Sequence, residues 1–368
     1  EAIKAGVKTV MISFNSWNGI KCHGNKFLVN DLLKDELGFK GLVVTDWAGI
    51  DEIPGNYKSD IIASINAGID LVMVPGDLYG QNHYKKFIRL LKESIKEGSI
   101  NISRIDDAVT RILRVKYEIN LFEDPFGKAE YAKYVGAEDH RTIARNAVKK
   151  SMVLLKNDSG ILPLKKDQKV YVVGSGANNL GMQNGGWTVE WQGRFTPDFK
   201  ILDENDDKRI EEKELKKFYK DIYSAKYDEG AAAGFFKALD INSDNYILEE
   251  EFNNYEEKSP YQPKGTSILN AMSQFMGTDG SIIYNPRANK LNENRTIIAV
   301  IGEYPYAEGY GDNGLLNLSV FDQEVLRKCY KTGNKVIVII LSGRPLMIKN
   351  HIDKWDGILA AWLPGMAG

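Results

Sequence analysis

Apolar and polar residues alternate in a strand–helix rhythm over the first third of the chain. Short apolar runs lie at 7–14, 42–45 and 69–74, and such runs are typical of buried strands in a parallel sheet. Apolar residues recur at helical spacing in four longer segments, at 26–37, 58–67, 81–97 and 103–119. This alternation predicts a parallel sheet with right-handed crossovers. A closed (β/α) barrel has eight strands, so we expect either the last third of such a barrel or a small open sheet.

A second α/β region follows an aperiodic stretch. Its apolar runs predict strands at 170–173, 297–301, 336–341 and 358–362, with helices at 139–151 and 321–331. One block within this region is instead acidic, rich in Lys and helical, which predicts an insertion. We therefore expect a first domain at 1–122, a linker at 123–139, a second domain at 140–197 and 263–368, and an insertion at 198–262.

Composition and charge narrow the classes of partner. The formal net charge is −2 and there is no basic stripe, so neither nucleic acid nor an anionic membrane is an expected partner. No apolar run approaches the ~20 residues of a membrane span. Four Asn-x-Ser/Thr sites give modest support to a secreted or lysosome-like compartment; they begin at Asn101, Asn157, Asn294 and Asn317. The chain starts without Met and both ends fall close to predicted elements, so we expect it to be a piece of a longer protein.

Two twelve-residue windows in the insertion share a pattern of oxygen ligands. The windows 203–214 and 240–251 each carry Asp, Asn and Asp at positions 1, 3 and 5 and Glu at position 12. This is the pattern of a calcium-binding EF-hand loop, in which position 7 contributes its main-chain carbonyl. The predicted Ca²⁺ ligands are Asp203, Asn205, Asp207, Arg209 and Glu214 in the first window, and Asp240, Asn242, Asp244, Tyr246 and Glu251 in the second.

Both windows depart from the EF-hand pattern at position 6. Gly normally makes the sharp turn there, whereas these loops have Lys208 and Asn245. Asn tolerates left-handed dihedral angles better than Lys, so we expect the second loop to hold its ion more securely, with micromolar or weaker affinity overall. The alternative is an acidic helical hairpin that binds no metal.

The apolar run at 42–45 ends in two residues of chemical interest. Asp46 follows the run directly, and an Asp at the carboxyl end of a parallel strand points into the crevice where α/β folds carry out their chemistry. Trp47 comes next and offers a flat apolar face on which a sugar ring can stack. From this stretch alone, Asp46 could equally be the N-cap of a following helix.

Several longer motifs share one resemblance. They lie at 10–25 (VMISFNSWNG followed by KCHGN), 37–47 (LGFKGLVVTDW), 144–164 (ARNAVKKSMVLLKN followed by LPL), 185–193 (GGWTVEWQG) and 302–313 (GEYPYAEGYGDN). In this order they resemble glycoside hydrolase family 3, and within it the exo-β-glucanase/β-glucosidase type. The resemblance covers nearly all of the chain outside the insertion. It implies the fold class α/β, with the C-terminal part of a (β/α)8-type barrel followed by an α/β sandwich domain that carries an all-α EF-hand insertion.

The resemblance also implies roles for individual residues. Asp46 corresponds to the nucleophile and Glu308 to the acid/base of a retaining glycosidase, which needs one ionised and one protonated carboxyl group. Burial against Trp47 and Trp187 is expected to keep Glu308 protonated. Trp187 and Trp191 resemble sugar-clamping aromatic residues, for which ordinary packing is the alternative.

Other polar residues in these motifs are weighed against those roles. Glu303 is the rival acid, but at the end of an apolar strand it is as readily a structural carboxylate, so Glu308 is preferred. His23 either orients a loop, contacts substrate or has a structural role. Neither Asp51 nor Arg344 is assigned to catalysis.

The resemblance predicts a hydrolase of β-glucosides or β-glucan oligosaccharides, with Ca²⁺ as a structural or modulatory ion and no cofactor needed for the chemistry. The earlier barrel residues that hold the non-reducing-end glucose in the family are absent, so we expect this piece to be inactive alone and the complete protein to be active. A coupling of calcium to the segment around Trp191 is a further hypothesis. The alternatives are a calcium-responsive carbohydrate-binding protein on a decayed hydrolase scaffold, and a β-xylosidase or β-N-acetylglucosaminidase.

Overall fold

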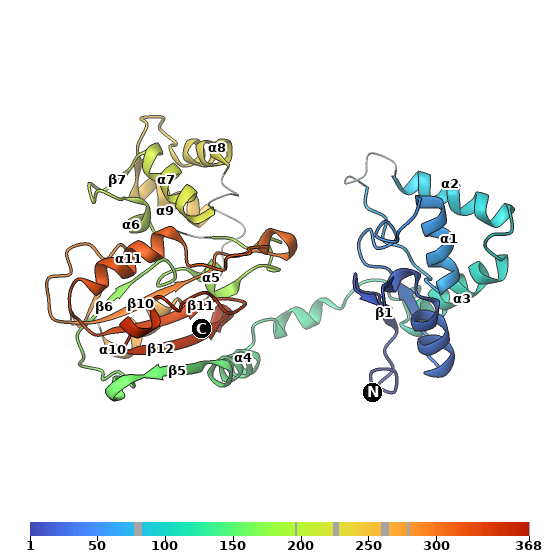
Figure 1. Ribbon diagram of the computed structural model, residues 1–368, viewed down its shortest axis with the longest axis horizontal. Coiled ribbons are helices and arrows are strands. Elements are labelled where there is room, and N and C mark those ends of the chain that lie inside the picture. Colours follow the sequence, from blue (N-terminus) through green and yellow to red (C-terminus); the bar gives the residue numbers. More distant parts are fainter. Residues whose placement is uncertain (77–82, 196, 224–227, 259–264, 278–279, 368) are drawn as a thin grey trace. The chain divides into compact units, whose positions relative to one another are not determined.

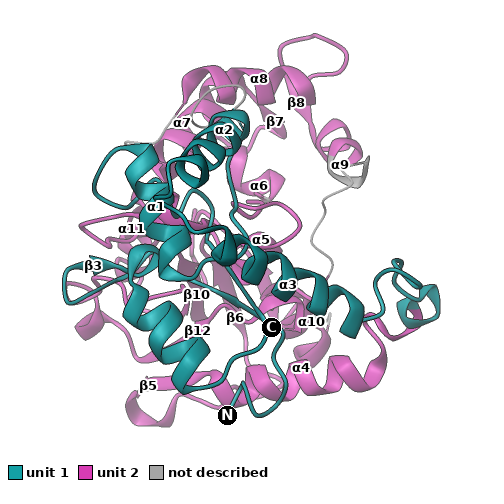
Figure 2. Ribbon diagram, turned by 90° about the vertical axis from the view of Figure 1, so that its right-hand side faces the viewer, with its two compact units in different colours: residues 1–132 teal, residues 133–368 magenta. Residues whose placement is uncertain are grey.

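The computed structural model describes residues 1–76, 83–195, 197–223, 228–258, 265–277 and 280–367. It divides into two compact units, unit 1 (1–132) and unit 2 (133–368), which Figure 1 and Figure 2 show. The division falls within the predicted linker at 123–139, a segment that contains the 3-10 helix η3 (Ala129–Tyr134) and the start of α4 (Glu138–Ser151). The predicted domain limits themselves stay predictions.

Unit 1 contains a short parallel strand pair. β1 (Thr9–Met11) pairs with β4 (Leu42–Val44), with Val10 opposite Val43. The strand expected at 69–74 is reduced to a single parallel bridge between Val44 and Leu71. The ladder ends there because the next amide available to it, that of Met73, donates to the Thr45 hydroxyl at 2.8 Å. A barrel therefore stays a prediction.

Helices surround this pair. Three of the predicted helices are confirmed as α1 (Tyr57–Ala67), α2 (His83–Lys96) and α3 (Ile102–Glu118), although positions 81–82 of the expected second helix lie outside the described residues. The segment expected to be helical at 26–37 forms a π-helix, η2 (Phe27–Glu36). The Asn56 side chain and Ser59 form a reciprocal capping box at the start of α1. The remaining elements are a small hairpin of β2 (Ser16–Trp17) and β3 (Ile20–Lys21) and the 3-10 turn η1 (Cys22–Gly24).

Unit 2 is built on a six-stranded mixed sheet, so the α/β class is confirmed. The strand order is β5-β12-β11-β10-β6-β9, in which only the pairing of β5 with β12 is antiparallel. The strands are β5 (Val153–Asn157), β6 (Val170–Val173), β9 (Ile282–Tyr284), β10 (Thr296–Gly302), β11 (Val336–Leu341) and β12 (Gly357–Trp362). Sequence analysis did not assign β5 or β9 as strands. Both are edge strands, and their side chains are only partly buried or exposed.

Alternate residues of the central strands point to opposite faces of the sheet, and each face has its own core. Val172 and Ile298 face the helices α5 (Leu180–Asn184) and α10 (Ile268–Met276). Val173 and Ala299 face α11 (Val320–Tyr330) on the other side. The sheet is therefore covered by helices on both faces, as a buried parallel sheet requires. Among the described residues of unit 2, the short 3-10 turns are η4 (Asp158–Gly160), η6 (Glu308–Gly311), η7 (Ile352–Lys354) and η8 (Gly365–Ala367).

A helical lobe (residues 199–258) lies over α11 (Figure 1). It consists of α6 (Phe199–Leu202), α7 (Glu212–Tyr223), α8 (Glu229–Leu239) and α9 (Glu249–Lys258), with a two-stranded link of β7 (Arg209–Ile210) and β8 (Ile247–Leu248). The apolar residues of the lobe do not form a separate core. They belong to the same buried cluster as the sheet residues that face α11, so the lobe is an integral part of unit 2. Within the described residues, no helix combines the length and apolarity of a membrane span.

Candidate functional site

The carboxyl end of β4 presents Asp46. Its backbone amide donates to Nε2 of His23 at 3.1 Å, and its Oδ1 accepts the amide of Trp47 at 2.7 Å. The next α-helix begins at Tyr57 and is capped by Asn56, so the N-cap interpretation of Asp46 is wrong. Asp46 is half-buried at a strand end, the position at which α/β folds place reacting groups.

His23 supports this position. Its side chain is fully buried, and burial lowers its pKa, an effect that the nearby Asp46 partly opposes. The imidazole is therefore neutral, and since Nε2 accepts the Asp46 amide, we assign the proton to Nδ1. A Cβ at Gly49 would lie 2.2 Å from Nε2, so only glycine fits beside the ring. Of the roles considered for His23, the geometry supports orientation of a loop, here the Asp46 loop, which contains residues 45–51.

Two other candidate residues of this loop, Trp47 and Asp51, differ in their surroundings. Trp47 is 51% exposed, so its ring is available to a ligand. Asp51 shares a hydrogen bond with Nε2 of His83 at 3.1 Å, in agreement with a structural rather than catalytic role. The sequence motif therefore contributes one strand-end carboxylate and one exposed aromatic face to unit 1.

A buried ion-pair network holds the middle of β4, and sequence analysis missed it. Asp70 accepts the amide of Val43 at 2.8 Å and pairs with Nζ of Lys34 at 2.7 Å, and Arg104 also contacts it. The Lys34 and Asp70 side chains are almost completely buried. The only available signal was a single Asp inside the apolar run 69–74. This network stabilises the strand whose carboxyl end presents Asp46.

In unit 2, Glu308 lies on the loop that follows β10, which we call the Glu308 loop (residues 303–311). Glu308 is exposed and has a φ of 51°, in the left-handed region. Trp187 is itself 69% exposed, so within unit 2 the expected burial of Glu308 by Trp187 is not present, and that expectation is wrong for this pair. Asp46 and Glu308 belong to different units.

Glu303 anchors the Glu308 loop. Its Oε1 accepts Nε and Nη2 of Arg344 at 3.0 and 2.8 Å, and its Oε2 accepts the hydroxyl of Tyr306 at 3.2 Å. Arg344 also donates to the carbonyl of Gly311 at 2.6 Å and lies over the Tyr306 ring. Glu303 is thus fully engaged as a structural carboxylate, which supports the preference for Glu308 as the acid.

A glycine-rich segment packs against this loop; we call it the tryptophan segment (residues 185–195). A Cβ at Gly186 would lie 2.0 Å from the carbonyl oxygen of Tyr306, so the two backbones touch. Oε1 of Gln192 accepts the amide of Ala307 at 2.8 Å, directly before Glu308. Sequence analysis did not find Gln192, whose role depends on a contact 115 residues away along the chain.

The tryptophan segment also gathers aromatic rings beside Glu308. Trp187 and Trp191 meet edge-on with ring centroids 6.2 Å apart, and Trp191 meets Tyr310 at 6.1 Å. All three rings are substantially exposed, which disfavours the interpretation that the tryptophans are core residues. The structure therefore brings the two predicted sugar-binding tryptophans together and adds Tyr310 to them.

The first predicted calcium loop folds around its own carboxylates. Asp203 accepts the amides of Asp207 and Lys208 at 3.2 and 2.9 Å. Glu214 is 4% exposed and accepts three amides, those of Glu204, Asn205 and Glu211, at 3.0, 3.3 and 2.9 Å. The ligand candidates at positions 1 and 12 are thus oriented by the backbone of the loop itself.

The second loop repeats this arrangement. Asp240 accepts the amides of Asp244 and Asn245 at 3.1 and 3.0 Å, and Glu251 accepts that of Leu248 at 3.0 Å. At position 3, Asn205 and Asn242 each accept the amide of position 5; at position 5, Asp207 and Asp244 each accept the amide of position 7. The position-7 residues Arg209 and Tyr246 stack on one another at 4.6 Å beside the β7–β8 link.

Both loops have left-handed residues at the same two places. The φ values are 63° and 67° at Asp206 and Lys208, and 60° and 68° at Ser243 and Asn245. Position 6 is therefore left-handed in each loop, as in a loop with Gly there. No three Asp, Glu, His or Cys side chains in the described part of the chain are gathered in an arrangement that could hold a metal ion. The oxygen donor types fit calcium, and in the structure they face backbone amides.

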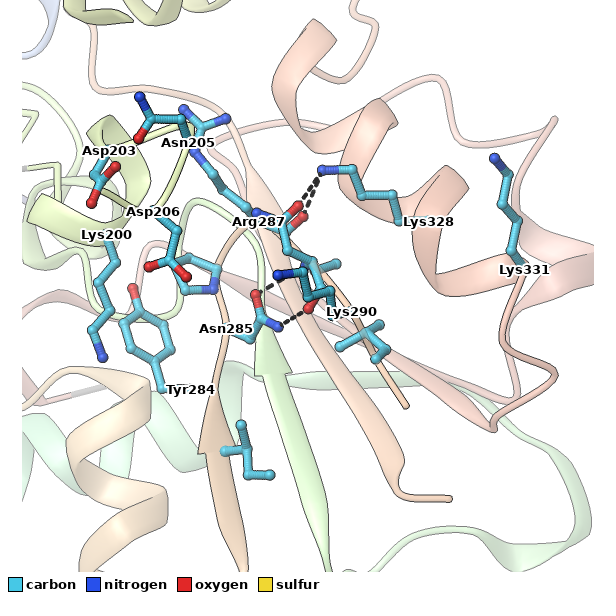
Figure 3. A pocket seen from close by; sticks show the side chains of 15 residues that line it. Lys200, Asp203, Asn205, Asp206, Tyr284, Asn285, Arg287, Lys290, Lys328 and Lys331 are labelled. Carbon is cyan, nitrogen blue, oxygen red and sulfur yellow. Dashed lines mark hydrogen bonds between the residues drawn. The ribbon is translucent and has the colours of Figure 1, made fainter. Parts of the chain in front are cut away.

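A pocket of 610 Å³ adjoins the first of these loops (Figure 3). Its walls include Asp203 and Asn205 on one side and Lys328 of α11 on another. Arg287 crosses it and donates from Nε to the carbonyl of Ile201 at 2.7 Å, while Lys328 donates to the carbonyl of Arg287 at 3.0 Å. Arg287 and Lys328 thus already have partners in the protein, and they connect α6, which directly precedes the first loop, to α11.

Comparison with known proteins places both units in one family. Residues 1–115 match the glycosyl hydrolase family 3 N terminal domain, and residues 152–368 match the glycosyl hydrolase family 3 C-terminal domain. A lysosomal beta glucosidase of Dictyostelium discoideum is 28% identical over 380 residues, covering 99% of this chain and 39% of the relative. A periplasmic beta-glucosidase of Salmonella typhimurium is 27% identical over 378 residues, covering 100% and 44%.

Solved structures agree with these matches. The exo-1,3/1,4-beta-glucanase ExoP from a Pseudoalteromonas species superposes with a TM-score of 0.70 at 33% identity, covering 99% of this chain and 38% of that one. The chain thus spans less than half the length of each of these relatives.

Proposed function

The chain belongs to glycosyl hydrolase family 3, and on this basis we propose that it is part of a retaining, exo-acting hydrolase of β-glucosides or β-glucan oligosaccharides. The observation that carries the proposal is the pair of carboxylates: Asp46 at the end of a parallel strand, and Glu308 on a loop flanked by exposed aromatic rings. The β-glucosidase and exo-glucanase relatives support the same reaction class.

The proposed reaction proceeds by two displacements. Glu308 donates its proton to the glycosidic oxygen while the Asp46 carboxylate attacks the anomeric carbon, so the bond to the leaving group breaks and a glycosyl ester forms on Asp46. Glu308, now ionised, takes a proton from water, which attacks the same carbon and releases Asp46. Trp47, Trp187 and Trp191 offer apolar faces for the sugar rings.

We further propose that the two loops of the helical lobe bind Ca²⁺. The first ion would be held by Asp203, Asn205, Asp207, the carbonyl of Arg209, and Glu214. The second would be held by Asp240, Asn242, Asp244, the carbonyl of Tyr246, and Glu251. The shared hydrogen-bond pattern and the shared left-handed residues of the two loops support this proposal. Calcium is proposed as a structural ion that contributes nothing to the chemical step.

The location proposed for the complete protein is a secreted or lysosome-like compartment. The names of the lysosomal and periplasmic relatives support it.

The test is hydrolysis of 4-nitrophenyl β-D-glucoside by the complete protein and by its Asp46→Asn variant. Loss of the nucleophile should lower kcat by about 10³-fold or more. The corresponding β-xyloside and β-N-acetylglucosaminide serve as competing substrates, and faster hydrolysis of either would reassign the sugar specificity. A wild-type protein that binds β-glucans but hydrolyses none of these substrates would favour the carbohydrate-binding alternative.

A further inference from the structure

The helical lobe and the Glu308 loop are joined by a continuous row of aromatic side chains. The row leaves the lobe at Phe218 on α7, which is 2% exposed. Phe218 stacks with Phe195 at 5.9 Å, and Phe195 meets Tyr304 edge-on at 4.6 Å. A second branch of the same helix reaches Tyr304 from Tyr223 at 6.3 Å. Two side chains of α7 thus converge, directly or through Phe195, on one residue of the Glu308 loop.

The two residues that end the row, Tyr304 and Phe195, lie in the Glu308 loop and in the tryptophan segment. Tyr304 is the second residue of the Glu308 loop, and burial raises its pKa well above the ordinary value, so the phenol stays neutral. Phe195 ends the tryptophan segment, whose Gln192 accepts the Ala307 amide beside Glu308. The lobe therefore touches the loop at its root through Tyr304, and touches the segment that holds its tip through Phe195.

The ion pair of Arg344 and the aromatic contacts of α7 stabilise the Glu308 loop in different ways. Arg344 ties Glu303 to Gly311, which closes the loop on itself and fixes its shape. The Glu308 side chain itself is exposed and has a left-handed backbone, so its direction depends on how the packed neighbours hold residues 304–307.

We propose that the helical lobe positions the general acid: α7, acting through Phe195 and Tyr304, holds the Glu308 loop in the orientation needed for proton donation. The proposal rests on the proposed role of Glu308 and adds to it a function for the lobe. Phe195, Phe218 and Tyr304 are positioning residues, since none of them is assigned a contact with substrate.

Substrates that differ only in their leaving group separate this role from general destabilisation. A phenyl β-glucoside needs a proton on its departing oxygen, whereas a 2,4-dinitrophenyl β-glucoside leaves readily without one. In the complete protein, Phe218→Leu should lower kcat/KM for the phenyl substrate by about 10-fold and change kcat/KM for the dinitrophenyl substrate by less than about 2-fold, because kcat/KM reports the first displacement and not the later attack of water. Phe195→Leu, at a partly buried position, should show the same ratio if Phe218→Leu folds poorly.

Two further variants complete the experiment. Phe252→Leu removes a matched ring contact inside the lobe, that with Phe199 at 6.0 Å, and should leave the ratio between the two substrates unchanged. Glu308→Gln should show the largest dependence on leaving group. If Glu308→Gln shows this dependence but Phe218→Leu and Phe195→Leu slow both substrates equally or neither, the positioning role is wrong and the role of Glu308 stands. If Glu308→Gln lacks the dependence, both assignments are overturned.

Discussion

The two proposed catalytic carboxylates are supported in opposite ways. Asp46 lies two residues after the parallel strand β4, with a buried neutral histidine at its amide and an ion-pair network that holds the middle of the same strand. Glu308 lies at the exposed tip of a loop that is held by side chains from distant parts of the sequence, among them Arg344 and Gln192. A nucleophile must present one fixed atom, whereas an acid/base must exchange protons with both a leaving group and water. The difference in support follows that division of tasks.

The largest expected difference between the Asp46 region and the Glu308 region is in the effect of matched glycine substitutions on activity. Gly49→Ala would place a Cβ 2.2 Å from Nε2 of His23 and should displace the Asp46 loop. Gly309, next to Glu308, has one neighbour at 4.0 Å, so Gly309→Ala should be tolerated. We expect kcat/KM for 4-nitrophenyl β-glucoside in the complete protein to fall by at least about 10²-fold for Gly49→Ala and by less than about 3-fold for Gly309→Ala. Equal effects of the two substitutions would contradict the view that the surroundings of Asp46 are more tightly packed than those of Glu308.

The two regions should also respond in opposite directions to pH. Asp322, which is fully buried, accepts the Ser175 amide at 3.1 Å and the Gly302 amide at 3.4 Å, at the root of the Glu308 loop. Burial raises its pKa to about 6, an effect that the hydrogen bonds from Ser175 and Gly302 oppose. The folded state therefore binds more protons than the unfolded state between about pH 4 and 6, so this contribution stabilises unit 2 in acid and is lost as pH rises through 6. It amounts to about 3 kcal/mol.

For His23 the dependence of stability on pH has the opposite sign. Its folded pKa is lowered by burial, so its contribution to stability is present above about pH 6.5 and is lost as pH falls. Hydrogen exchange of the amides in β4 and β10, measured at pH 5 and pH 7.5, checks both signs. Protection of β10 should weaken relative to β4 at the higher pH, and Asp322→Asn should abolish that trend for β10. The same trend in both strands would contradict the assignment.

A smaller effect is expected at the anchor of the Glu308 loop. Arg344→Lys keeps a positive charge but loses the two parallel hydrogen bonds to Glu303, which lysine cannot form with the same geometry. We expect kcat for the phenyl β-glucoside to fall by about 10-fold with little change in KM. Arg327→Lys on the exposed surface of α11 is the control and should be neutral. A change confined to KM would indicate that Arg344 shapes a binding surface rather than the loop.

The smallest expected effect compares the two calcium loops. Lys208 and Asn245 have nearly the same left-handed φ, which is more costly for lysine. Lys208→Gly should therefore make calcium binding to the first loop more favourable by about 1 kcal/mol, and Asn245→Gly should change that of the second loop by less. Isothermal titration of each variant of the complete protein with CaCl₂ measures this. No heat of binding at millimolar calcium in the wild type would contradict the calcium proposal itself.

Local patterns predicted the elements well. The spacing of apolar residues identified the segments that became α1, α3 and α11, and unbroken apolar runs identified the central strands of unit 2. The edge strands β5 and β9 were not predicted, although each contains a short apolar run, at 153–155 and 282–284, and the structure leaves these residues only partly buried or exposed.

Long-range polar contacts could not be predicted in this way. The pairs formed by Lys34 with Asp70 and by Glu303 with Arg344 join segments 36 and 41 residues apart, and no periodicity relates the partners. Gln192 and Tyr304 are similar cases, because their roles depend on neighbours that the fold brings to them. The sequence motifs identified which carboxylates to examine, and the contacts around those carboxylates required the structure.

The most direct test of the central claim is to trap the covalent intermediate. The complete protein would be incubated with 2,4-dinitrophenyl 2-deoxy-2-fluoro-β-glucoside, whose fluorine slows release of the glycosyl group from the enzyme, and then digested and mapped by mass spectrometry. The proposed mechanism predicts one added fluoroglucosyl group, located on Asp46. A label on any other residue, or release of dinitrophenol without a label, would contradict the assignment of Asp46 as the nucleophile.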